Sequence, residues 1–430
     1  MRLNKAQAIA AMVIGALILV FVLGIIGVIP GIKKGGDNTD FPTAKISLAM
    51  WGVGDSRADF TDAIAAYQGL HPNVSINYRE FESWQAYEAE LLNALAESRG
   101  PDIVMVKSSW VDTHKAKLYP LLPQFLSVNS FTQRYPKVVV DDFVRDGQIW
   151  AMPLYMDTMV LLYNQDMFDA NAIAFAPTDW DMFVSDSSLL RRIQNGQEVA
   201  QAGTALGSAS NVANMSDILT MLMLQSGAPI VSSQGGVRFG DSALQALEFY
   251  LQFANSLRSA YTWNETLPFS LRHFAAGKVG MVLGYKKDLD TIKDENPFLN
   301  VGVVQVPQVN QYSPLTVADY TGLSVSRQIG QVRAYVAWDF IRTFLLSSSL
   351  YDGYLASSER LPATRTGLSA LLGGEYDAFT RSAFIARTWP KMEWDQIQNI
   401  FVSMIQDIRS GRVSTSQALR AAQDAINRLY

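Results

Sequence analysis

The sequence predicts an α/β protein with a parallel sheet, preceded by one N-terminal transmembrane helix. Two observations carry this prediction: strand and helix patterns alternate from residue 46 to residue 106, and a long apolar stretch without charge precedes them. The composition is that of a folded chain, because 49% of its 430 residues are hydrophobic and only 17% are charged. This length suggests two or three domain-sized units.

Charge and cysteine content exclude several functional classes. The chain has 35 Lys and Arg against 40 Asp and Glu and no long basic run, so a nucleic-acid partner is not expected. It has no cysteine, and its three histidines, His71, His114 and His273, are far apart in the sequence. These features exclude a disulfide framework, a thiolate nucleophile and the common zinc motifs. We expect no metal, no cofactor and no catalytic residue.

The transmembrane prediction rests on residues 6–32, which are almost wholly aliphatic and carry no charge. About 20 such residues cross a hydrocarbon layer. The stretch is longer than the apolar part of a cleaved signal peptide and ends in Pro30 and Gly31 followed by lysines. We therefore expect an uncleaved anchor with a polar tether, together residues 1–44. A cleaved signal peptide and a helix buried in a larger assembly are the alternatives. Basic residues flank both ends equally, so they do not orient the helix.

Five alternating segments follow the tether. Residues 46–50, 74–81 and 103–106 have the pattern of strands, and residues 57–70 and 83–97 have the pattern of helices. This βαβαβ order predicts a parallel sheet. Further on, the pattern predicts extended runs over 150–163, helices at 178–190, 211–225, 241–257, 332–345 and 397–408, and strands at 280–283, 301–306 and 323–325.

Three tryptophans stand at the carboxyl ends of the predicted strands, where ligands bind in open α/β sheets. Trp51 comes directly after the first strand, Trp84 shortly after the second and Trp110 shortly after the third. An exposed indole offers a flat apolar face and one hydrogen-bond donor, which suits stacking on a sugar ring. The alternative for each tryptophan is packing under a neighbouring helix.

The order of segments resembles the extracellular solute-binding proteins of ABC importers, in the group that contains maltose-binding protein. The resemblance covers nearly all of residues 45–430. Its most specific piece is DGQIWAMPLYMDTMVLLYNQDMF at residues 146–168, supported by GPDI at 100–103 and FAAGKVGMVLGY at 274–285. TDWDMF at 178–183 and ERLPATR at 359–365 also fit.

The resemblance implies a two-lobed α/β fold, of the periplasmic-binding-protein type, with a hinge and a ligand cleft between the lobes. Carried over, lobe one comprises residues 45–155 with 299–329, and lobe two comprises 156–298 with 330–430. The chain is then expected to cross between the lobes near Tyr155, Pro297 and Ile329.

The resemblance also implies binding residues. Asp157 matches a cleft carboxylate of the sugar binders, able to accept two hydroxyl hydrogen bonds. Tyr285 matches a sugar-stacking aromatic, although GPW of the family is GYK here. Lys107 lies at the expected cleft mouth, and Tyr155 lies at an expected lobe crossing. Tyr320 stands, with Asp319, where relatives have a Gly pair, and it is expected to narrow the cleft. The acidic pair Asp141–Asp142 is expected in a solvated turn. The predicted ligand-binding residues are therefore Trp51, Trp84, Lys107, Trp110, Tyr155, Asp157, Tyr285 and Tyr320.

These features predict a monomeric, membrane-anchored receptor on the extracytoplasmic side, which captures a mono- or oligosaccharide and delivers it to an ABC permease. Two alternatives remain at this point. One is a surface-anchored carbohydrate-active enzyme, which requires two carboxylates about 5 to 9.5 Å apart across one cleft. The other is a ligand-sensing ectodomain that is not coupled to transport.

Overall fold

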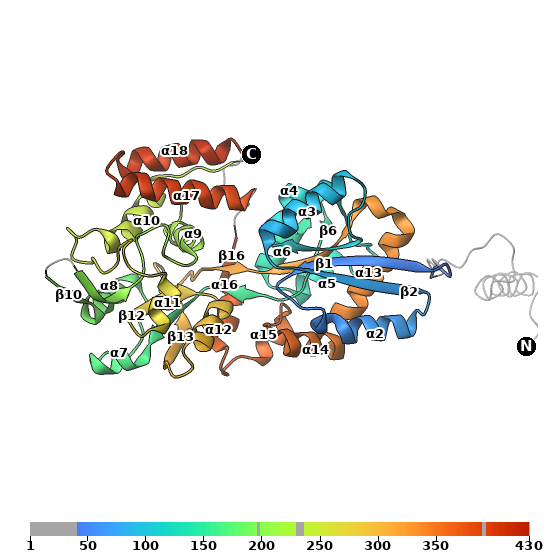
Figure 1. The fold of residues 1–430 in the computed structure, drawn as a ribbon, viewed down its shortest axis with the longest axis horizontal. Helices are drawn as coiled ribbons and strands as arrows, with labels where there is room; N and C mark the ends of the chain where they lie inside the picture. The colour runs from blue at the N-terminus through green and yellow to red at the C-terminus, as the bar shows by residue number, and fades with distance from the viewer. Residues whose placement is uncertain (1–40, 196–197, 229–235, 389–392, 430) are drawn as a thin grey trace, which may run out of the picture. The chain divides into compact units, whose positions relative to one another are not determined.

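The computed structural model describes residues 41–195, 198–228, 236–388 and 393–429. The predicted membrane segment, residues 6–32, lies outside these ranges. Among the described residues no helix is long and apolar enough to cross a membrane. Residues 45–430 form one unit with two lobes, each built on its own sheet (Figure 1).

The sheet of lobe one has the order β2-β1-β3-β15-β4, with β7 also paired to β15. β1, β2 and β3 are parallel, which confirms the βαβαβ prediction, whereas β15 runs antiparallel to β3. β2 alternates buried and exposed residues over its first half, and the middle of β3 is wholly buried. The strands are β1 (Ile46–Val53), β2 (Val74–Phe81), β3 (Ile103–Lys107), β4 (Leu118–Tyr119), β7 (Met152–Pro153) and β15 (Thr321–Ser326).

The helices of lobe one pack on this sheet through apolar faces. Tyr67 of α2 and Tyr87 and Leu91 of α3 are buried, at the spacing that the sequence predicted. The helical segments on this side are η1 (Ala58–Phe60), α2 (Thr61–Leu70), α3 (Trp84–Ala96), α4 (Trp110–His114), η2 (Lys115–Lys117), η4 (Arg327–Ile329), α13 (Gly330–Leu346) and α14 (Ser348–Ser358). The segment before the lobe crossing adds α5 (Val128–Arg134), α6 (Lys137–Phe143), β5 (Val144–Arg145) and β6 (Gln148–Ile149).

The sheet of lobe two has the order β10-β11-β12-β9-β13. β9 lies antiparallel between β12 and β13, so the strand ending in YN at residues 163–164 is central in this sheet. The strands are β9 (Val160–Asn164), β10 (Arg192–Gln194), β11 (Glu198–Thr204), β12 (Val279–Gly284) and β13 (Val301–Gln305). A large apolar core fills the space between this sheet and its helices.

The helices of lobe two include the last two of the chain. α17 buries Ile397, Phe401, Met404 and Ile405 along one face, as its apolar pattern predicted, and packs against α18 and α9. The helices are α7 (Gln165–Ala170), α8 (Trp180–Leu190), α9 (Met215–Gln225), α10 (Asp241–Leu251), η3 (Gln252–Ala254), α11 (Ser270–Ala275), α12 (Lys286–Glu295), α17 (Trp394–Arg409) and α18 (Thr415–Asn427).

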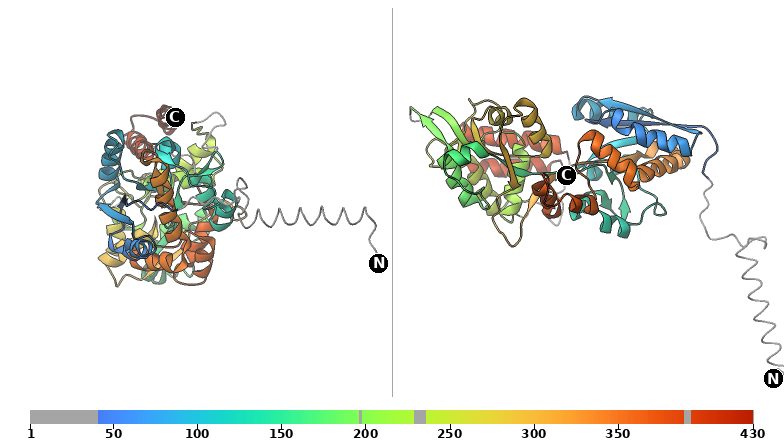
Figure 2. Two further views of the ribbon diagram at one scale, coloured as in Figure 1. Left: turned by 90° about the vertical axis from the view of Figure 1, so that its right-hand side faces the viewer. Right: turned by 90° about the horizontal axis from the view of Figure 1, so that it is seen from below.

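A short three-stranded sheet lies between the two large sheets. Its order is β16-β14-β8, and the strands are β8 (Asp157–Thr158), β14 (Thr316–Asp319) and β16 (Ala386–Arg387). Helix α16 (Asp377–Ile385) packs on β8 and β13, and α15 (Arg365–Ala370) packs on α16. Seen from below, the lobes are separate masses joined by thin connections (Figure 2).

The strand pairing corrects part of the expected lobe boundaries. β13 belongs to the second sheet, and α13 and α14 pack on β15, β1 and α2 of lobe one. The chain therefore passes between the sheets through β8, as expected near Tyr155, but also through β14 and between α14 and α16. It does not cross near Pro297 or Ile329. The expected lobe was wrong for β13 and for the pair α13 and α14. The packing partners of these elements are distant in sequence, so the local sequence pattern did not reveal their lobe.

Candidate functional site

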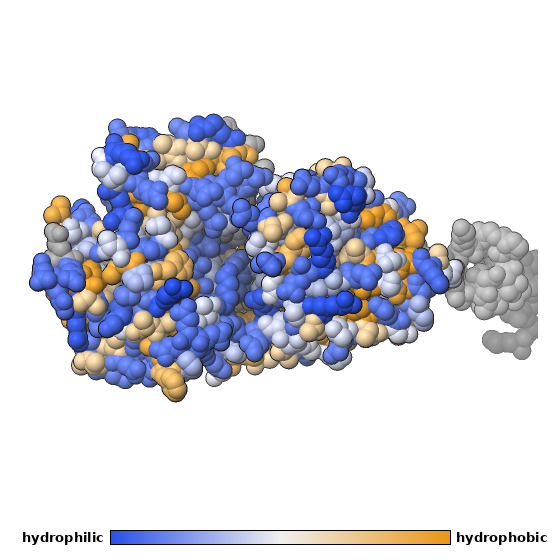
Figure 3. Space-filling model, viewed as in Figure 1, coloured by the Kyte–Doolittle hydropathy of each residue, from blue (hydrophilic) through white to orange (hydrophobic). Residues whose placement is uncertain are grey.

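The surface is hollowed between the two lobes, and the walls of this hollow are largely hydrophilic (Figure 3). The eight predicted ligand-binding residues do not gather in one place. Trp84, Lys107 and Trp110 form one group, Asp157 and Tyr285 meet at the start of α12, Tyr155 lies under Arg360, and Trp51 and Tyr320 are packed within lobe one.

The aromatic group lies where β3 ends and where α3 and α4 begin. The rings of Trp84 and Trp110 meet edge to face, with centroids 5.5 Å apart. Tyr87 stacks beneath Trp110, with centroids 5.9 Å apart. The Lys107 ammonium lies 5.3 Å from the Trp84 ring and 5.8 Å from the Trp110 ring, within the range of cation–π attraction. The structure thus brings three of the predicted residues together.

Lys107 also reaches across to lobe two. Its Nζ lies 3.2 Å from Oδ1 of Asp395, near the start of α17. A small cavity of about 40 Å³ lies beside this ion pair, lined by Glu88, Trp110, Thr113, His114, Glu393, Trp394 and Asp395. The lining comes from both lobes. A hydrogen bond from His114, whose Nε2 is 3.5 Å from the carboxylate, lowers the pKa of Glu88.

Trp394 and Asp395 were not among the predicted binding residues. The available signal was a tryptophan and two acidic residues, Glu393 and Asp395, directly before the amphipathic run that begins at Ile397. That signal concerns the N-terminus of a helix, and only the fold places this terminus opposite β3.

The side chain of Asp157 accepts hydrogen bonds from the N-terminus of α12. Its Oδ1 accepts hydrogen bonds from the backbone N–H of Thr158 at 2.8 Å and of Lys286 at 2.9 Å, and its Oδ2 accepts one from Lys287 at 3.2 Å. Burial raises the pKa of Asp157 to about 7, while the backbone N–H groups of α12 and the Lys287 ammonium lower it. The carboxylate thus satisfies two N–H groups that the helix leaves unpaired. This is a structural role that the predicted match to a sugar-binding carboxylate did not include.

Tyr285 is the residue before α12 and is fully buried. Its N–H donates to Asp288 at 2.8 Å, and the Lys287 ammonium lies 5.1 Å from its ring. Lys287 in turn donates to Asp319 of β14 at 2.6 Å. Burial first, and then the charge of Asp217, raise the pKa of the Tyr285 hydroxyl well above its usual value. In this arrangement the ring presents no face to solvent, and the lining of the adjoining cavity starts one residue later, at Lys286.

Tyr155 lies beneath the guanidinium of Arg360, which is 4.5 Å from the ring centroid. Arg360 lies 3.4 Å from Oδ1 of Asp55, and the Tyr354 hydroxyl donates to Oδ2 of Asp55 at 2.9 Å. Asp55 is 1% exposed, and burial raises its pKa against the opposing charge of Arg360. Asp55 and Arg360 were missed, although Arg360 stands in the ERLPATR segment.

Trp51 and Tyr320 have other structural partners. Trp51 lies within β1 instead of after it, 9% exposed, with its ring 5.2 Å from that of Phe81. Tyr320 is 1% exposed and donates from its hydroxyl to Val138 O at 3.1 Å and to the Asp142 carboxylate. Asp142 is correspondingly buried in α6 and not in a solvated turn, because Tyr320 requires an acceptor there.

A cavity of about 460 Å³ is lined from both lobes. Lobe two contributes α12, and lobe one contributes the end of α14 and the turn after it. Its residues are Lys286, Asp290, Lys293, Asp294, Leu355, Ala356, Glu359, Arg360, Leu361 and Tyr376. Lys286 pairs with Asp290 at 2.7 Å, and its ammonium lies 5.5 Å from the Tyr376 ring. Tyr155 and Asp157 support this lining from behind: the Tyr155 ring contacts Arg360, and the Asp157 carboxylate accepts a hydrogen bond from the Lys286 N–H.

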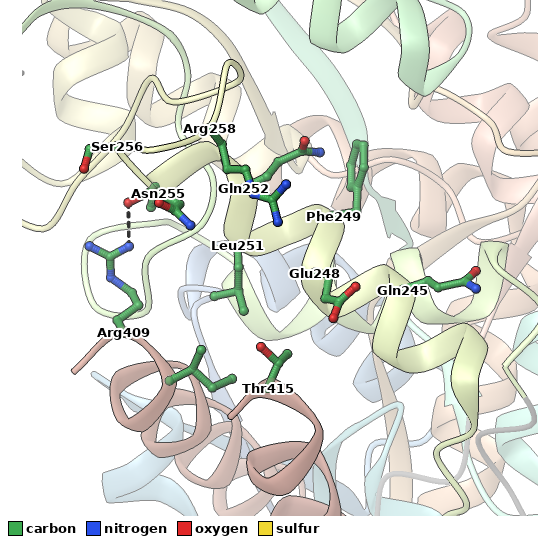
Figure 4. A pocket seen from close by; sticks show the side chains of 12 residues that line it. Gln245, Glu248, Phe249, Leu251, Gln252, Asn255, Ser256, Arg258, Arg409 and Thr415 are labelled. Atoms are coloured by element: carbon green, nitrogen blue, oxygen red, sulfur yellow. Dashed lines mark hydrogen bonds between the residues drawn. The ribbon is translucent and has the colours of Figure 1, made fainter. Parts of the chain in front are cut away.

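A larger groove of about 770 Å³ lies within lobe two, between α10, η3 and the loop after it on one side and α17 and α18 on the other (Figure 4). Polar side chains such as Gln245, Gln252 and Arg258 line it, and Arg409 donates to Ala254 O at 2.9 Å. None of the eight predicted residues lines this groove, and lobe one contributes nothing to it. Within the described residues, no group of three or more His, Cys, Asp and Glu side chains is placed to hold a metal ion.

Comparison with known proteins agrees with this fold. A diacetylchitobiose-binding protein of Streptomyces coelicolor is 21% identical over 399 residues, covering 89% of this chain and 90% of that protein. A protein of Brucella abortus named as a binding protein is 21% identical over 253 residues, and the match spans only 59% of its length. The sugar-binding protein MalE of Xanthomonas citri has the same fold, with a TM-score of 0.73 at 18% identity over 89% of this chain and 97% of that one.

The family model described as bacterial extracellular solute-binding protein matches residues 62–370. The family and both relatives are described as binding proteins and not as enzymes. A match over more than half of the chain, joined to the two-lobed fold, decides the family: this chain belongs to the bacterial extracellular solute-binding proteins.

Proposed function

We propose that this protein is a receptor that captures a small carbohydrate between its two lobes. The observation that carries the proposal is the 460 Å³ cavity lined by α12 of lobe two and by the end of α14 of lobe one. Cavities of about 300 to 1,000 Å³ hold small ligands. A ligand there contacts both lobes, so its binding energy favours the arrangement that brings them together.

The chemistry of the lining suits a polyhydroxylated ligand. Lys286 offers an ammonium donor and Asp290 a carboxylate acceptor, and the two form an ion pair. Ligand hydroxyl groups can therefore hydrogen-bond to either side chain while each charge keeps its partner of opposite sign. Arg360 is likewise compensated by Asp55. Tyr376 provides an aromatic ring. The balance of charges favours a neutral ligand over an ionic one.

Similar proteins support the carbohydrate class. The Streptomyces coelicolor relative binds diacetylchitobiose, and the Xanthomonas citri protein with the same fold is a sugar-binding protein. These ligands belong to those proteins; for this chain they define the first compounds to test.

A saccharide screen tests the proposal. Residues 41–430 are mixed with mono- and oligosaccharides, amino acids, polyamines and anions, and the melting temperature is recorded, because a ligand that binds only the folded form raises it. The proposal predicts a rise with one class of saccharide and no consumption of that saccharide on long incubation. A rise only with charged, non-carbohydrate compounds contradicts it.

A matched pair of variants tests the cavity itself. Tyr376→Ala removes the aromatic ring of the lining and should weaken saccharide binding roughly tenfold, about 1.4 kcal/mol. Tyr312→Ala removes a fully exposed tyrosine outside the lining and should leave affinity unchanged. Equal affinities for both variants, measured by titration calorimetry, exclude the cavity as the binding site.

The N-terminal segment supplies the rest of the proposal. Residues 6–32 anchor the receptor in the membrane with residues 45–430 on the extracytoplasmic side, where an ABC permease receives the ligand. Alkaline extraction of membranes from producing cells should leave the full chain in the membrane and release a chain that starts at residue 41. Stimulation of the permease ATPase by the ligand-loaded receptor distinguishes transport from a purely sensing role.

A further inference from the structure

The ion pair between Lys107 and Asp395 joins the two lobes at the cleft mouth. Lys107 is the last residue of β3 in lobe one, and Asp395 is the second residue of α17, which packs on α9 and α18 in lobe two. Lys107 Nζ lies 3.2 Å from one carboxylate oxygen and 3.4 Å from the other. Because the two residues come from different lobes, the pair exists only while the lobes hold these two ends together.

Two tryptophans hold Lys107 in position for this contact. The ammonium lies over Trp84 and Trp110 at 5.3 and 5.8 Å from their ring centroids, and the side chain is only 17% exposed. Trp110 is itself fixed by stacking on the buried Tyr87. A lysine confined in this way loses less side-chain freedom when it pairs than a free surface lysine does.

The space beside the pair is too small for a sugar. The adjoining cavity of about 40 Å³ has room for a few water molecules, since about 10 to 15 Å³ of such volume holds one. The 460 Å³ cavity lies at another place, where α12 and the end of α14 line it. This end of the hollow is therefore a contact between lobes, not room for a ligand.

We propose that Lys107 and Asp395 form a closing latch, which stabilises the closed arrangement of the lobes before a ligand is bound. The latch sets the fraction of ligand-free molecules that are closed, and the apparent affinity for a ligand follows that fraction. Only this last consequence rests on the proposed function. Because the Asp395 side chain is 54% exposed, the pair shifts the equilibrium about two- to fivefold.

The absence of cysteine makes the lobe separation measurable in the full chain. Ala65→Cys on α2 and Ala170→Cys on α7 place one spin label on an exposed position of each lobe. Electron–electron dipolar spectroscopy of this protein in detergent, without ligand, gives the distribution of distances between the lobes. The same measurement is made after Lys107→Met, after Asp395→Asn and after the charge swap Lys107→Asp with Asp395→Lys.

The latch predicts that either single variant lowers the ratio of closed to open molecules about two- to fivefold and that the charge swap restores it. Added salt should lower this ratio in the wild type and in the charge swap, which hold the ion pair, and not in the variants that lack it. Lys137→Met is the matched control, because its pair with Asp141 lies within α6. Glu393 stands near Asp395 and lines the same cavity, so Asp395→Asn is combined with Glu393→Gln to remove a substitute acceptor.

Identical distance distributions in the wild type, in Lys107→Met and in the combined acceptor variant overturn the latch. If no saccharide binds this protein, the spectroscopic result still decides the latch, because the measurement needs no ligand. If a saccharide binds and the distributions do not change, the latch alone is wrong and the proposed function stands.

Discussion

The carboxylate of Asp157 accepts a hydrogen bond of 2.9 Å from the backbone N–H of Lys286. Asp157 lies in the connecting strand β8, and Lys286 is the first residue of α12. The side chain of Lys286 lines the cavity between the lobes. The connection between lobes and the wall of the cavity therefore share one buried carboxylate. Changes at Asp157 should alter stability and binding together.

Asp157→Ala should lower the free energy of unfolding by about 1–2 kcal/mol, because the first two N–H groups of α12 lose their acceptor. Asp157→Asn keeps one acceptor oxygen and should lose less. Urea unfolding followed by circular dichroism measures both. If Asp157→Ala weakens saccharide binding without any loss of stability, the carboxylate contacts ligand directly instead of supporting the helix.

The contribution of Asp157 to stability should depend on pH. Its pKa is about 7 in the folded protein, where burial raises it, and about 3.9 in an unfolded chain. Between pH 4 and pH 7 the folded protein binds the Asp157 proton more tightly than the unfolded chain does. The contribution of Asp157 to the free energy of unfolding therefore falls as pH rises from 4 to 7, and it is constant above pH 7. The full difference is at most about 4 kcal/mol. Unfolding free energies of the wild type and Asp157→Asn, measured from pH 4 to 8, should diverge toward low pH in favour of the wild type; parallel curves would show that Asp157 titrates near its usual value.

Arg360→Met should destabilise lobe one by about 2–4 kcal/mol, because it leaves the Asp55 carboxylate buried with the Tyr354 hydroxyl as its remaining side-chain donor within the described contacts. The double variant Asp55→Asn with Arg360→Met should cost less than the sum of the two single variants. Additive losses in a double-mutant cycle would show that the pair is not coupled.

The two cleft-mouth tryptophans should differ in their effect on stability. Trp110 is 6% exposed and stacks on Tyr87, so Trp110→Ala should cost about 3–5 kcal/mol. Trp84 is half-buried at the start of α3, and Trp84→Ala should cost about 1–2 kcal/mol. Thermal or urea unfolding ranks the two, and an equal cost would contradict the burial difference on which this prediction depends.

Local pattern predicted much of this fold and less of its site. The strands at 74–81 and 103–106 and the apolar face beginning at Ile397 were predictable, because alternation and helical spacing are written in consecutive residues. The partner of Asp157 was not, because Lys286 is distant in sequence and the pairing of β12 with β9, which sets Gly284 opposite Val160, brings the start of α12 to it. The burial of Tyr320 was not predictable for the same reason, since Asp142, its hydrogen-bond partner, is distant in sequence.

The most direct test of the proposed function is a crystal structure of residues 41–430 with the saccharide that gives the largest thermal shift. The proposed function predicts sugar rings between the lobes, hydrogen-bonded to Lys286 or Asp290 of α12 on one side and to Arg360 of lobe one on the other. A sugar held by one lobe alone, such as in the groove between α10 and α17, would contradict it.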